Sequence, residues 1–342
     1  MATQARTCSN AECHLASENK CVEGYEPDEC PHVRLVSAER VQESDDAAVG
    51  LTSVDDTIGL DRGEALDRGQ ASRLQLRNIS RTIALIGPHD SGKTSMIAGL
   101  YDLLQQGPLA GVSFAGSSTL IGFEQVCHLA RAESRRKVPH MERTIRGADA
   151  TFFHLDLHQQ DAGLSSLFIG DRSGEDYLTV SDQLSHADQL FEVRRADCVT
   201  ILVNGEQLAS TALRHETVAA IQQVVDALIE ARVIRRGCRL ALVLTKKDAV
   251  FASAHRDRGL RDFARLVSTI ADSHSEYLGR VHSFVVAASP KRCDEVKRGE
   301  GVGELLLFWL EATQPARSAT DGSRPDFERA IDRLTRDKEL DD

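Results

Sequence analysis

Residues 82–94 read TIALIGPHDSGKT, and this stretch decides the fold. Its first part, residues 82–86, is a short apolar run with β-branched side chains, which is typical of a strand buried on both faces. A glycine-rich loop with the spacing GxxxxGK[ST] follows at residues 87–94, and the next residues, SMIAGLYDLL, favour a helix. A strand, a glycine loop and a helix in this order predict a loop that binds phosphate groups.

The residue types in this loop suit the phosphates of a nucleotide. Glycines let the backbone wrap an anion, and the following helix directs its free N–H groups and the positive end of its dipole at that anion. The side chain of Lys93 would add a full charge at the β- and γ-phosphates, and Thr94 would offer its hydroxyl to Mg²⁺. The loop residues expected to bind the nucleotide and Mg²⁺ are Gly87, Asp90, Ser91, Gly92, Lys93 and Thr94.

Two alternatives stay open for this loop. The whole stretch can be a plain glycine turn between a strand and a helix, although this spacing in this context seldom arises by chance. The carboxylate of Asp90 can approach the bound phosphates or a monovalent cation, or it can simply cap the loop.

Beyond residue 80, short apolar runs alternate with segments of helical length. This alternation predicts an α/β protein with the three-layer fold of P-loop NTPases and a mostly parallel sheet. The run TFFHLDL at residues 151–157 alternates in part with polar residues, so it is expected nearer an edge of the sheet. The other expected strands are residues 82–86, 167–170, 198–203, 240–244 and 281–287, and the expected helices include residues 216–233, 260–278 and 303–312.

A carboxylate and a glycine follow the strand expected at residues 167–170. Asp171 begins the sequence DRSG, and a carboxylate at the carboxyl end of a strand beside the phosphate loop can hold Mg²⁺ through water. Three residues later, the backbone N–H of Gly174 can face a γ-phosphate. Because DxxG is short and common, its value comes from its place after the phosphate loop in the chain.

The segment LALVLTKKDAV at residues 240–250 points to the base of the nucleotide. The carboxylate of Asp248 can accept hydrogen bonds from N1–H and the 2-amino group of guanine, a donor pair that adenine lacks, and the stem of Lys246 can lie over the ring. A solvated charge run after a strand is the alternative. One strand later, VVAAS at residues 285–289 can bring the backbone N–H of Ala288 to guanine O6.

In this order, the four segments resemble the motifs of TRAFAC-class GTPases over roughly residues 80–313. The resemblance implies binding of GTP with Mg²⁺ and hydrolysis to GDP, with switch loops around Asp171 and before residue 151. Thr144 in ERTIRG is the candidate switch threonine for Mg²⁺, Thr119 is a rival, and a surface threonine without a role is the remaining alternative. The expected catalytic residues are Lys93, Thr144, Gly174 and Glu175.

Two features depart from that pattern. Glu175 follows DxxG where many such GTPases have glutamine; a carboxylate can orient water but also repels phosphates, so slow intrinsic turnover is expected. The segment before residue 151 is long and basic, and one of its side chains can act as an arginine finger in cis, although a solvated basic helix face is the alternative. These basic residues are Arg131, Arg135, Arg136, Lys137, Arg143 and Arg146.

Four cysteines lie within the first 30 residues, at Cys8, Cys13, Cys21 and Cys30. Four thiolates at this spacing can close a tetrahedral Zn²⁺ site that stabilises a short segment, and His32 or His14 can replace one of them. An iron–sulfur cluster and unrelated free thiols are the alternatives. Residues 1–34 hold three basic and six acidic residues, which favours a structural or protein-docking knuckle over a nucleic-acid finger. The other cysteines, expected to be packing residues, are Cys127, Cys198, Cys238 and Cys293.

The order of a cysteine-rich start, a linker, and then GPHDSGKT, GDRSGEDY and TKKD resembles the bacterial group called double-GTPase 2. Members of this group are proposed components of GTPase-centred conflict or defence systems. The resemblance therefore implies a protein partner, either a second GTPase or an effector.

Composition excludes several other classes. The chain has 342 residues, a net charge of −11 and 41% hydrophobic residues, so it can bury a core but is not expected to bind nucleic acid. No basic start followed by an apolar region marks a secretory signal, and no run of about 18 apolar residues predicts a membrane span. We therefore expect a cytoplasmic protein with reduced thiols.

These observations divide the chain into four parts. We expect a zinc-knuckle-like segment at residues 1–35, an acidic linker with at most a short helix at 36–79, the GTPase domain at 80–313 and a polar tail at 314–342. In the tail, one helical stripe docks on its own domain or on a partner; it consists of Phe327, Ile331 and Leu334. Two other functions stay open: a non-hydrolysing, nucleotide-responsive binding module, and an ATP-using P-loop NTPase in which TKKD is accidental.

Overall fold

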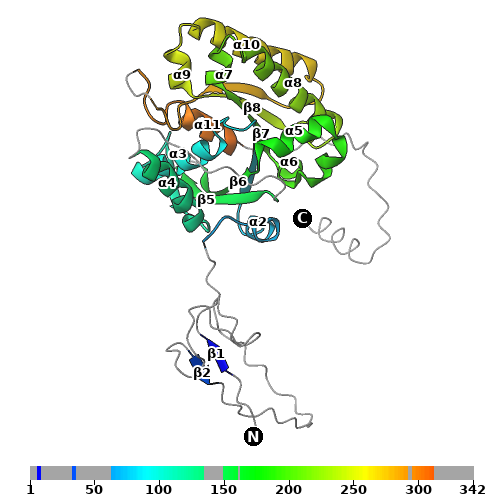
Figure 1. Cartoon of the computed structure of the whole chain (residues 1–342). Helices are drawn as coiled ribbons and strands as arrows, with labels where there is room; N and C mark the ends of the chain where they lie inside the picture. The colour runs from blue at the N-terminus through cyan, green and yellow to red at the C-terminus, as the bar shows by residue number, and fades with distance from the viewer. Residues whose placement is uncertain are drawn as a thin grey trace, which may run out of the picture. The chain divides into compact units, whose positions relative to one another are not determined.

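The computed structural model describes residues 6–8, 33–35, 63–134, 149–160, 162–291 and 295–311. The chain divides into two units, Met1–Gly59 and Leu60–Asp342. In the first unit, strands β1 (Arg6–Cys8) and β2 (Val33–Leu35) pair antiparallel. The seven-stranded sheet and the labelled helices of Figure 1 belong to the second unit.

A seven-stranded sheet forms the centre of the second unit. Five neighbouring strands run parallel, and two further strands, each antiparallel to its neighbour, complete one edge, so the prediction of a mostly parallel sheet is confirmed. In spatial order the strands are β4 (Val112–Gly116), β5 (Thr151–Gln159), β6 (Gly163–Asp171), β3 (Ser80–Ile86), β7 (Cys198–Asn204), β8 (Arg239–Thr245) and β9 (Val281–Val285).

This edge of the sheet contains one strand that the sequence did not reveal. Strand β5 lies next to the edge, as its partial alternation predicted, but the edge strand itself is β4, with the sequence VSFAG. Only Val112 of this strand is buried, so there is no continuous apolar run to mark it. An edge strand covered on one side needs few apolar residues, which explains why it was missed.

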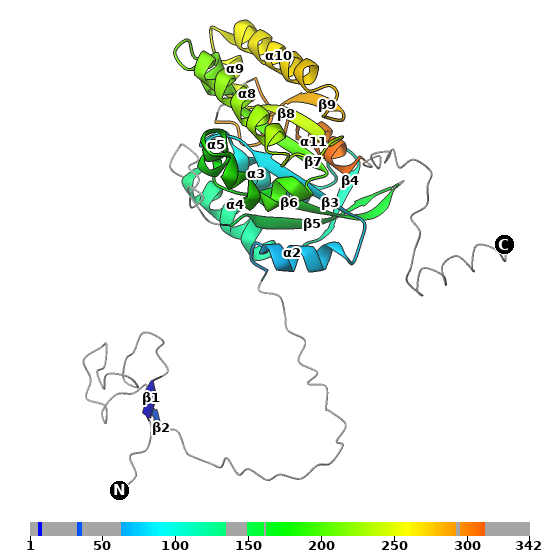
Figure 2. The ribbon, with the colours of Figure 1, turned by 90° about the vertical axis from the view of Figure 1, so that its right-hand side faces the viewer.

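Helices cover both faces of the sheet, which gives the three expected layers (Figure 2). One face carries α3 (Lys93–Gln106), α4 (Leu120–Ser134) and α11 (Val302–Leu310). The other carries α5 (Gly174–Asp182), the 3-10 helix η1 (Leu184–Gln189), α6 (Phe191–Arg195), α7 (Gly205–Ala209), α8 (Arg214–Glu230), α9 (Lys247–Phe251) and α10 (Arg256–Ser273).

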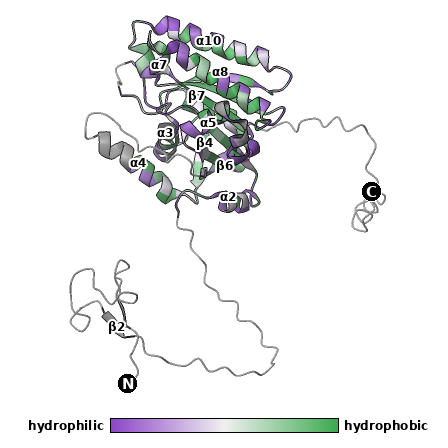
Figure 3. Cartoon of the chain, turned by 45° about the vertical axis from the view of Figure 1, so that its right-hand side comes forward, coloured by the Kyte–Doolittle hydropathy of each residue, from purple (hydrophilic) through white to green (hydrophobic). Residues whose placement is uncertain are grey.

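The central strand β3 explains why its sequence is a continuous apolar run. Ile83 and Leu85 pack in the cluster beneath α3, whereas Ala84 and Ile86 pack in the cluster on the opposite face. Both faces therefore exclude water, and neither tolerates polar alternation. Figure 3 shows hydrophobic colour on the neighbouring strand β7 and hydrophilic colour interrupting the outer helix α10.

Residues of the sequence-assigned linker pack on this sheet. Helix α2 (Arg68–Gln75) begins at Asp67, whose carboxylate accepts the N–H of Gln70 at 2.8 Å while the Gln70 side chain accepts the N–H of Asp67 at 2.9 Å. Just before it, Leu66 exchanges two backbone hydrogen bonds with Phe152 of β5. Only a few apolar residues hold this helix in place, so the hydrophobic pattern gave little sign of the packing.

The three described lone cysteines are buried, which confirms the prediction that they are packing residues: Cys127, Cys198 and Cys238. Burial raises the pKa of the Cys198 thiol to about 12 and that of Cys238 to about 11, so both stay protonated at neutral pH. Cys293 lies outside the described residues, as do Cys13, Cys21, Cys30 and the stripe residues Phe327, Ile331 and Leu334. In the described part of the chain, the helices lack the length and apolar character required to cross a bilayer.

Candidate nucleotide-binding site

The phosphate loop lies between the carboxyl end of β3 and the start of α3. Its backbone turns tightly, with left-handed conformations at Asp90 (φ 58°) and Gly92 (φ 93°). A Cβ atom on Gly87 would lie 2.5 Å from the Ser91 hydroxyl and 2.9 Å from the Leu202 carbonyl oxygen, so only glycine fits there. The sequence spacing therefore folds into the cradle that it predicted.

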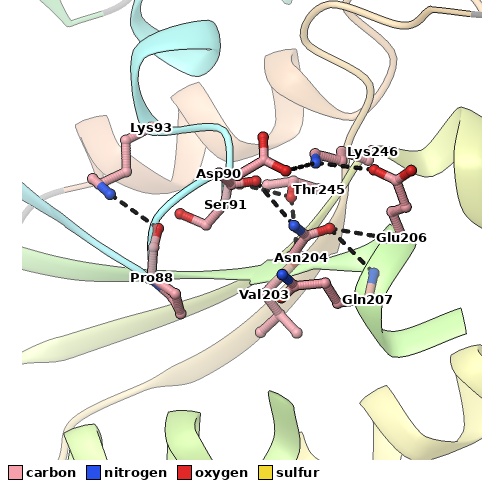
Figure 4. Close-up of polar contacts among 10 residues, drawn as sticks. All are labelled: Pro88, Asp90, Ser91, Lys93, Val203, Asn204, Glu206, Gln207, Thr245 and Lys246. Atoms are coloured by element: carbon pink, nitrogen blue, oxygen red, sulfur yellow. Dashed lines mark hydrogen bonds and ion pairs between the residues drawn. The ribbon is translucent and has the colours of Figure 1, made fainter. Parts of the chain in front are cut away.

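Lys93 is buried inside this cradle. Its Nζ donates a hydrogen bond to the carbonyl oxygen of Pro88 at 3.2 Å (Figure 4) and another to the carbonyl oxygen of Gly87 at 2.9 Å. Burial lowers the pKa of Lys93, and the nearby charge of Asp171 offsets part of that effect. The Ser91 hydroxyl is also buried and has no hydrogen-bond partner among the described residues. A buried cation, a buried hydroxyl and a helix N-terminus together suit a phosphate anion.

The DRSG segment packs directly against the phosphate loop. Asp171 is the last residue of β6, the strand next to β3, and Gly174 begins α5. A Cβ atom on Gly174 would lie 2.5 Å from the carbonyl oxygen of Gly87 and 2.8 Å from the backbone nitrogen of His89. The glycine is therefore required for the two loops to touch.

A buried ion pair fixes the chain beyond Asp171, and sequence reasoning missed it. Arg172 donates from Nε to Glu192 Oε1 at 2.8 Å and from Nη2 to the carbonyl oxygen of Gln189 at 2.9 Å. The hydroxyl of Tyr177 donates to the same Glu192 oxygen at 3.0 Å, and burial raises the pKa of Tyr177 well above its usual value. No sequence pattern links positions so far apart, so only the fold reveals this anchor.

The side chains of Thr94 and Asp171 are the protein oxygens that suit Mg²⁺. Thr94 lines the cleft in the first turn of α3, and the charge of the buried Asp171 acts on Lys93 in the adjoining loop. Mg²⁺ commonly binds through one or two protein oxygens, substrate phosphates and several waters. The hydroxyl of Thr94 and the carboxylate of Asp171 match this mode of Mg²⁺ binding. The described residues contain no cluster of three or more metal-ligating side chains that would bind a metal without the nucleotide.

The TKKD segment ends strand β8 and enters the same region. Thr245 donates its hydroxyl to the carbonyl oxygen of Ser91 at 2.8 Å, which joins this loop to the phosphate loop. Asp248 is buried in α9 and accepts the backbone N–H of Lys291 at 2.9 Å. Ala288 lines the cleft as well, and α3 approaches it closely, because a Cβ on Gly99 would lie 2.9 Å from the Ala288 carbonyl oxygen.

One cleft of about 1120 Å³ brings these segments together. It is lined by residues from each predicted motif, including Asp90, Ser91, Gly92, Lys93, Thr94, Ser95, Gly174, Glu175, Lys246, Asp248 and Ala288. Gly87 and Asp171 do not line it; the first adjoins the lining residue Pro88, and the second acts on Lys93 through its charge.

One sequence candidate lies away from the cleft, and others fall outside the part of the chain that the structure describes. Thr144 lies outside the described residues, as do the side chains of the six basic residues proposed as arginine fingers. The rival Thr119 is buried elsewhere, where its hydroxyl accepts the backbone N–H of His154 at 2.9 Å. Asn204, at the end of β7, was not singled out from the sequence, yet it donates to the Asp90 carbonyl oxygen at 3.0 Å. A polar residue closing a buried strand was the sign that could have revealed it.

This fold and this cleft define a P-loop nucleotide-binding protein. The family model of Double-GTPase 2 matches residues 81–310. The chain therefore belongs to the Double-GTPase 2 family.

Solved structures give further similarities. The chain resembles the signal recognition particle receptor in the SRb-GTP/SRX complex from Chaetomium thermophilum, with 16% identity and a TM-score of 0.37 over 68% of this chain and 96% of that chain. It also resembles the Ski7 GTPase-like domain of S. cerevisiae bound to GDP and inorganic phosphate, with 12% identity and a TM-score of 0.37 over 70% of this chain and 51% of that chain. No curated protein sequence matches the chain.

Proposed function

We propose that the chain binds GTP with Mg²⁺, hydrolyses it to GDP and phosphate, and acts as a nucleotide-dependent switch. The observation that carries this proposal is the meeting of the phosphate loop, the DRSG segment and the TKKD segment in one cleft. Membership of the Double-GTPase 2 family supports it.

Asp248 would select guanine. Its carboxylate is buried, and it would accept hydrogen bonds from N1–H and the 2-amino group of the base, while the stem of Lys246 covers the ring. Adenine would leave this buried carboxylate without matching donors, which is costly in a desolvated site. The proposed specificity therefore comes from rejection of adenine as much as from attraction of guanine.

Lys93, Thr94, Asp171 and Gly174 would act on the phosphates. Lys93 supplies positive charge, Thr94 and Asp171 hold Mg²⁺, and the N–H of Gly174 senses the γ-phosphate. Bound Mg²⁺ would neutralise the charge that develops on the β- and γ-phosphate oxygens. The contribution of the chain is positioning and electrostatic stabilisation rather than covalent chemistry.

Glu175 and Thr144 complete the proposed hydrolytic groups. In hydrolysis, water attacks the γ-phosphorus, the bond to the β–γ bridging oxygen breaks, and GDP leaves with inorganic phosphate. Glu175 lines the cleft in the first turn of α5, where it would orient this water. Its charge also opposes the approach of phosphates, so we expect slow intrinsic turnover. For the same reason a non-hydrolysing binding module is the second candidate function.

Replacing Gly174 with alanine is expected to separate the DRSG segment from the phosphate loop. The new Cβ would lie 2.5 Å from the Gly87 carbonyl oxygen, so one of the two loops must move. We expect phosphate release to slow at least tenfold, on the order expected for loss of one transition-state hydrogen bond. A malachite-green phosphate assay measures this. The control is Gly116→Ala, whose Cβ meets only Asp156 at 3.8 Å; equal rates in both variants would contradict the role of Gly174.

The biological role and the N-terminal metal are further parts of the proposal. The family likeness supports work in a bacterial conflict or defence system together with a second GTPase or an effector. The four N-terminal cysteines support a structural Zn²⁺ site within residues 1–35. A linker joins this segment to the GTPase domain. A zinc assay on the purified full chain tests the metal.

The function itself is tested by titration and turnover of the full chain. We expect GTP and GDP to bind at least a hundredfold more tightly than ATP in the presence of Mg²⁺. We also expect phosphate release from GTP that stops with EDTA and is absent in Lys93→Ala, which controls for contaminating hydrolases. Equal binding of ATP and GTP would overturn the assignment of the base. Tight GTP binding without phosphate release would select the non-hydrolysing module.

A further inference from the structure

A closed ring of polar contacts joins the phosphate loop to the TKKD segment, residues 245–248, which we call the base loop (Figure 4). Asn204 donates from Nδ2 to the carbonyl oxygen of Asp90 at 3.0 Å, and its Oδ1 accepts the N–H of Glu206 at 3.1 Å. Glu206 Oε2 pairs with Lys246 Nζ at 3.1 Å, and the same Nζ pairs with Asp90 Oδ2 at 2.6 Å. The ring thus returns to the residue where it began.

Asn204 is the buried member of this ring. It is 1% exposed, whereas the carboxylate side chains of Asp90 and Glu206 are 62% and 57% exposed. Ion pairs between exposed groups contribute little, because water and salt screen them. A buried amide that loses its partners leaves polar groups unsatisfied, which is far more costly. The effect of the ring on the loop therefore depends mainly on Asn204.

The backbone that Asn204 holds is strained. Asp90 adopts a left-handed conformation (φ 58°), which is unfavourable for a residue with a Cβ atom. The bond from Asn204 fixes its carbonyl group, and the bond from Thr245 at 2.8 Å fixes the next carbonyl, that of Ser91. Because the C=O and the following N–H of a trans peptide point in opposite directions, the Thr245 bond directs the N–H of Gly92 away from Thr245. Two side chains from two strands thus set the orientation of the loop.

Asn204 also begins helix α7. Its Oδ1 accepts the N–H groups of both Glu206 and Gln207, which caps the helix. The residue does not line the cleft, so its effect on a ligand must pass through the Asp90 carbonyl. A single side chain therefore ties the phosphate loop to the helix whose Glu206 holds Lys246 of the base loop.

We propose that Asn204 is a positioning residue for phosphate binding: it holds the loop at Asp90 in its binding conformation before the nucleotide arrives. This inference rests on the proposed function only in that a nucleotide occupies the cleft. Thr245 performs the same task at Ser91, from the neighbouring strand.

The test measures how much of the nucleotide affinity depends on the β-phosphate. Asn204→Ser keeps an oxygen that can cap α7 but removes the amide that donates to Asp90. With the full chain, dissociation constants for GMP and GDP are measured by calorimetry. The two ligands share the same base, but only GDP carries the β-phosphate that would occupy the phosphate loop. We expect Asn204→Ser to weaken GDP about tenfold, the effect of losing one buried hydrogen bond, and to change GMP less than twofold.

Matched variants at the second tie sharpen this test. Thr245→Val removes the hydroxyl that donates to Ser91 and should reproduce the selective loss of GDP affinity, whereas Thr245→Ser keeps the hydroxyl and should restore it. A general loosening of the fold would weaken GMP and GDP alike, so an unchanged ratio of the two constants in Asn204→Ser overturns the proposal. If the wild-type chain shows no preference for guanine, the proposed function fails by itself, and AMP with ADP then gives the same ratio for Asn204.

Discussion

Asp248→Ala should abolish the preference of the chain for guanine nucleotides. The carboxylate is buried in the first turn of α9. We expect its removal to lower the ratio of GTP affinity to ATP affinity by about a hundredfold or more. Calorimetric titration of both nucleotides measures that ratio. The loss should fall on GTP, because the alanine variant no longer meets the two donors of guanine, while ATP no longer has to face an unmatched buried charge.

Alanine also removes a structural contact, so a second variant is needed. Asp248 accepts the backbone N–H of Lys291 at 2.9 Å, and this bond holds the loop that carries Ala288. Asp248→Asn keeps the size of the side chain and an oxygen that can accept this N–H. Its amide presents a donor where the carboxylate accepted, which matches the carbonyl group of xanthine in place of the 2-amino group of guanine.

We therefore expect Asp248→Asn to bind xanthosine triphosphate more tightly than GTP, while its melting temperature stays near that of the wild type. A gain of xanthine affinity cannot come from a damaged fold, so this variant distinguishes recognition from stability. Unchanged base preference in both variants would place the base elsewhere in the cleft and would remove the argument for GTP.

The sequence predicted the ends of the strands better than the connections between them. The phosphate loop at residues 87–94, the DRSG segment and the TKKD segment each follow a continuous apolar run, and parallel strands bring their carboxyl ends to one edge of a sheet. Their convergence on one cleft was therefore derivable from local patterns alone. The roles assigned to Lys93, Asp171, Gly174 and Asp248 are still predictions, whereas their placement is observed.

What the sequence did not reveal depends on pairing between distant residues. Arg172 reads as one more charge in DRSG, and only the fold shows that Glu192 neutralises it in the core. Asn204 reads as the polar end of a strand, and only the fold places Asp90 within hydrogen-bonding distance. Strand β4 was missed for a different reason, because an edge strand with one buried residue has no pattern to detect. Long-range polar contacts and half-exposed edges are the features that periodicity cannot report.

Lys93→Ala should remove phosphate binding without destabilising the fold. We expect GDP affinity to fall by about a hundredfold or more, because a buried ammonium group facing a phosphate makes strong charge-assisted hydrogen bonds. The loss should depend on the phosphates and not on the base: GDP and ADP should be affected alike, and guanosine should not change. Competition against a fluorescent GDP analogue measures these affinities.

The stability of the same variant gives the stricter test of this role. Burial lowers the pKa of Lys93, so at neutral pH the charged side chain is less favourable in the folded protein than in the unfolded chain. Its two bonds to the carbonyl oxygens of Gly87 and Pro88 offset part of that cost. A residue kept for structure would lower the melting temperature when it is removed. We expect Lys93→Ala, without nucleotide, to melt at or above the wild-type temperature, because the site holds a desolvated charge in readiness for a ligand. A clear loss of stability together with retained GDP binding would assign Lys93 to the fold and not to the phosphate.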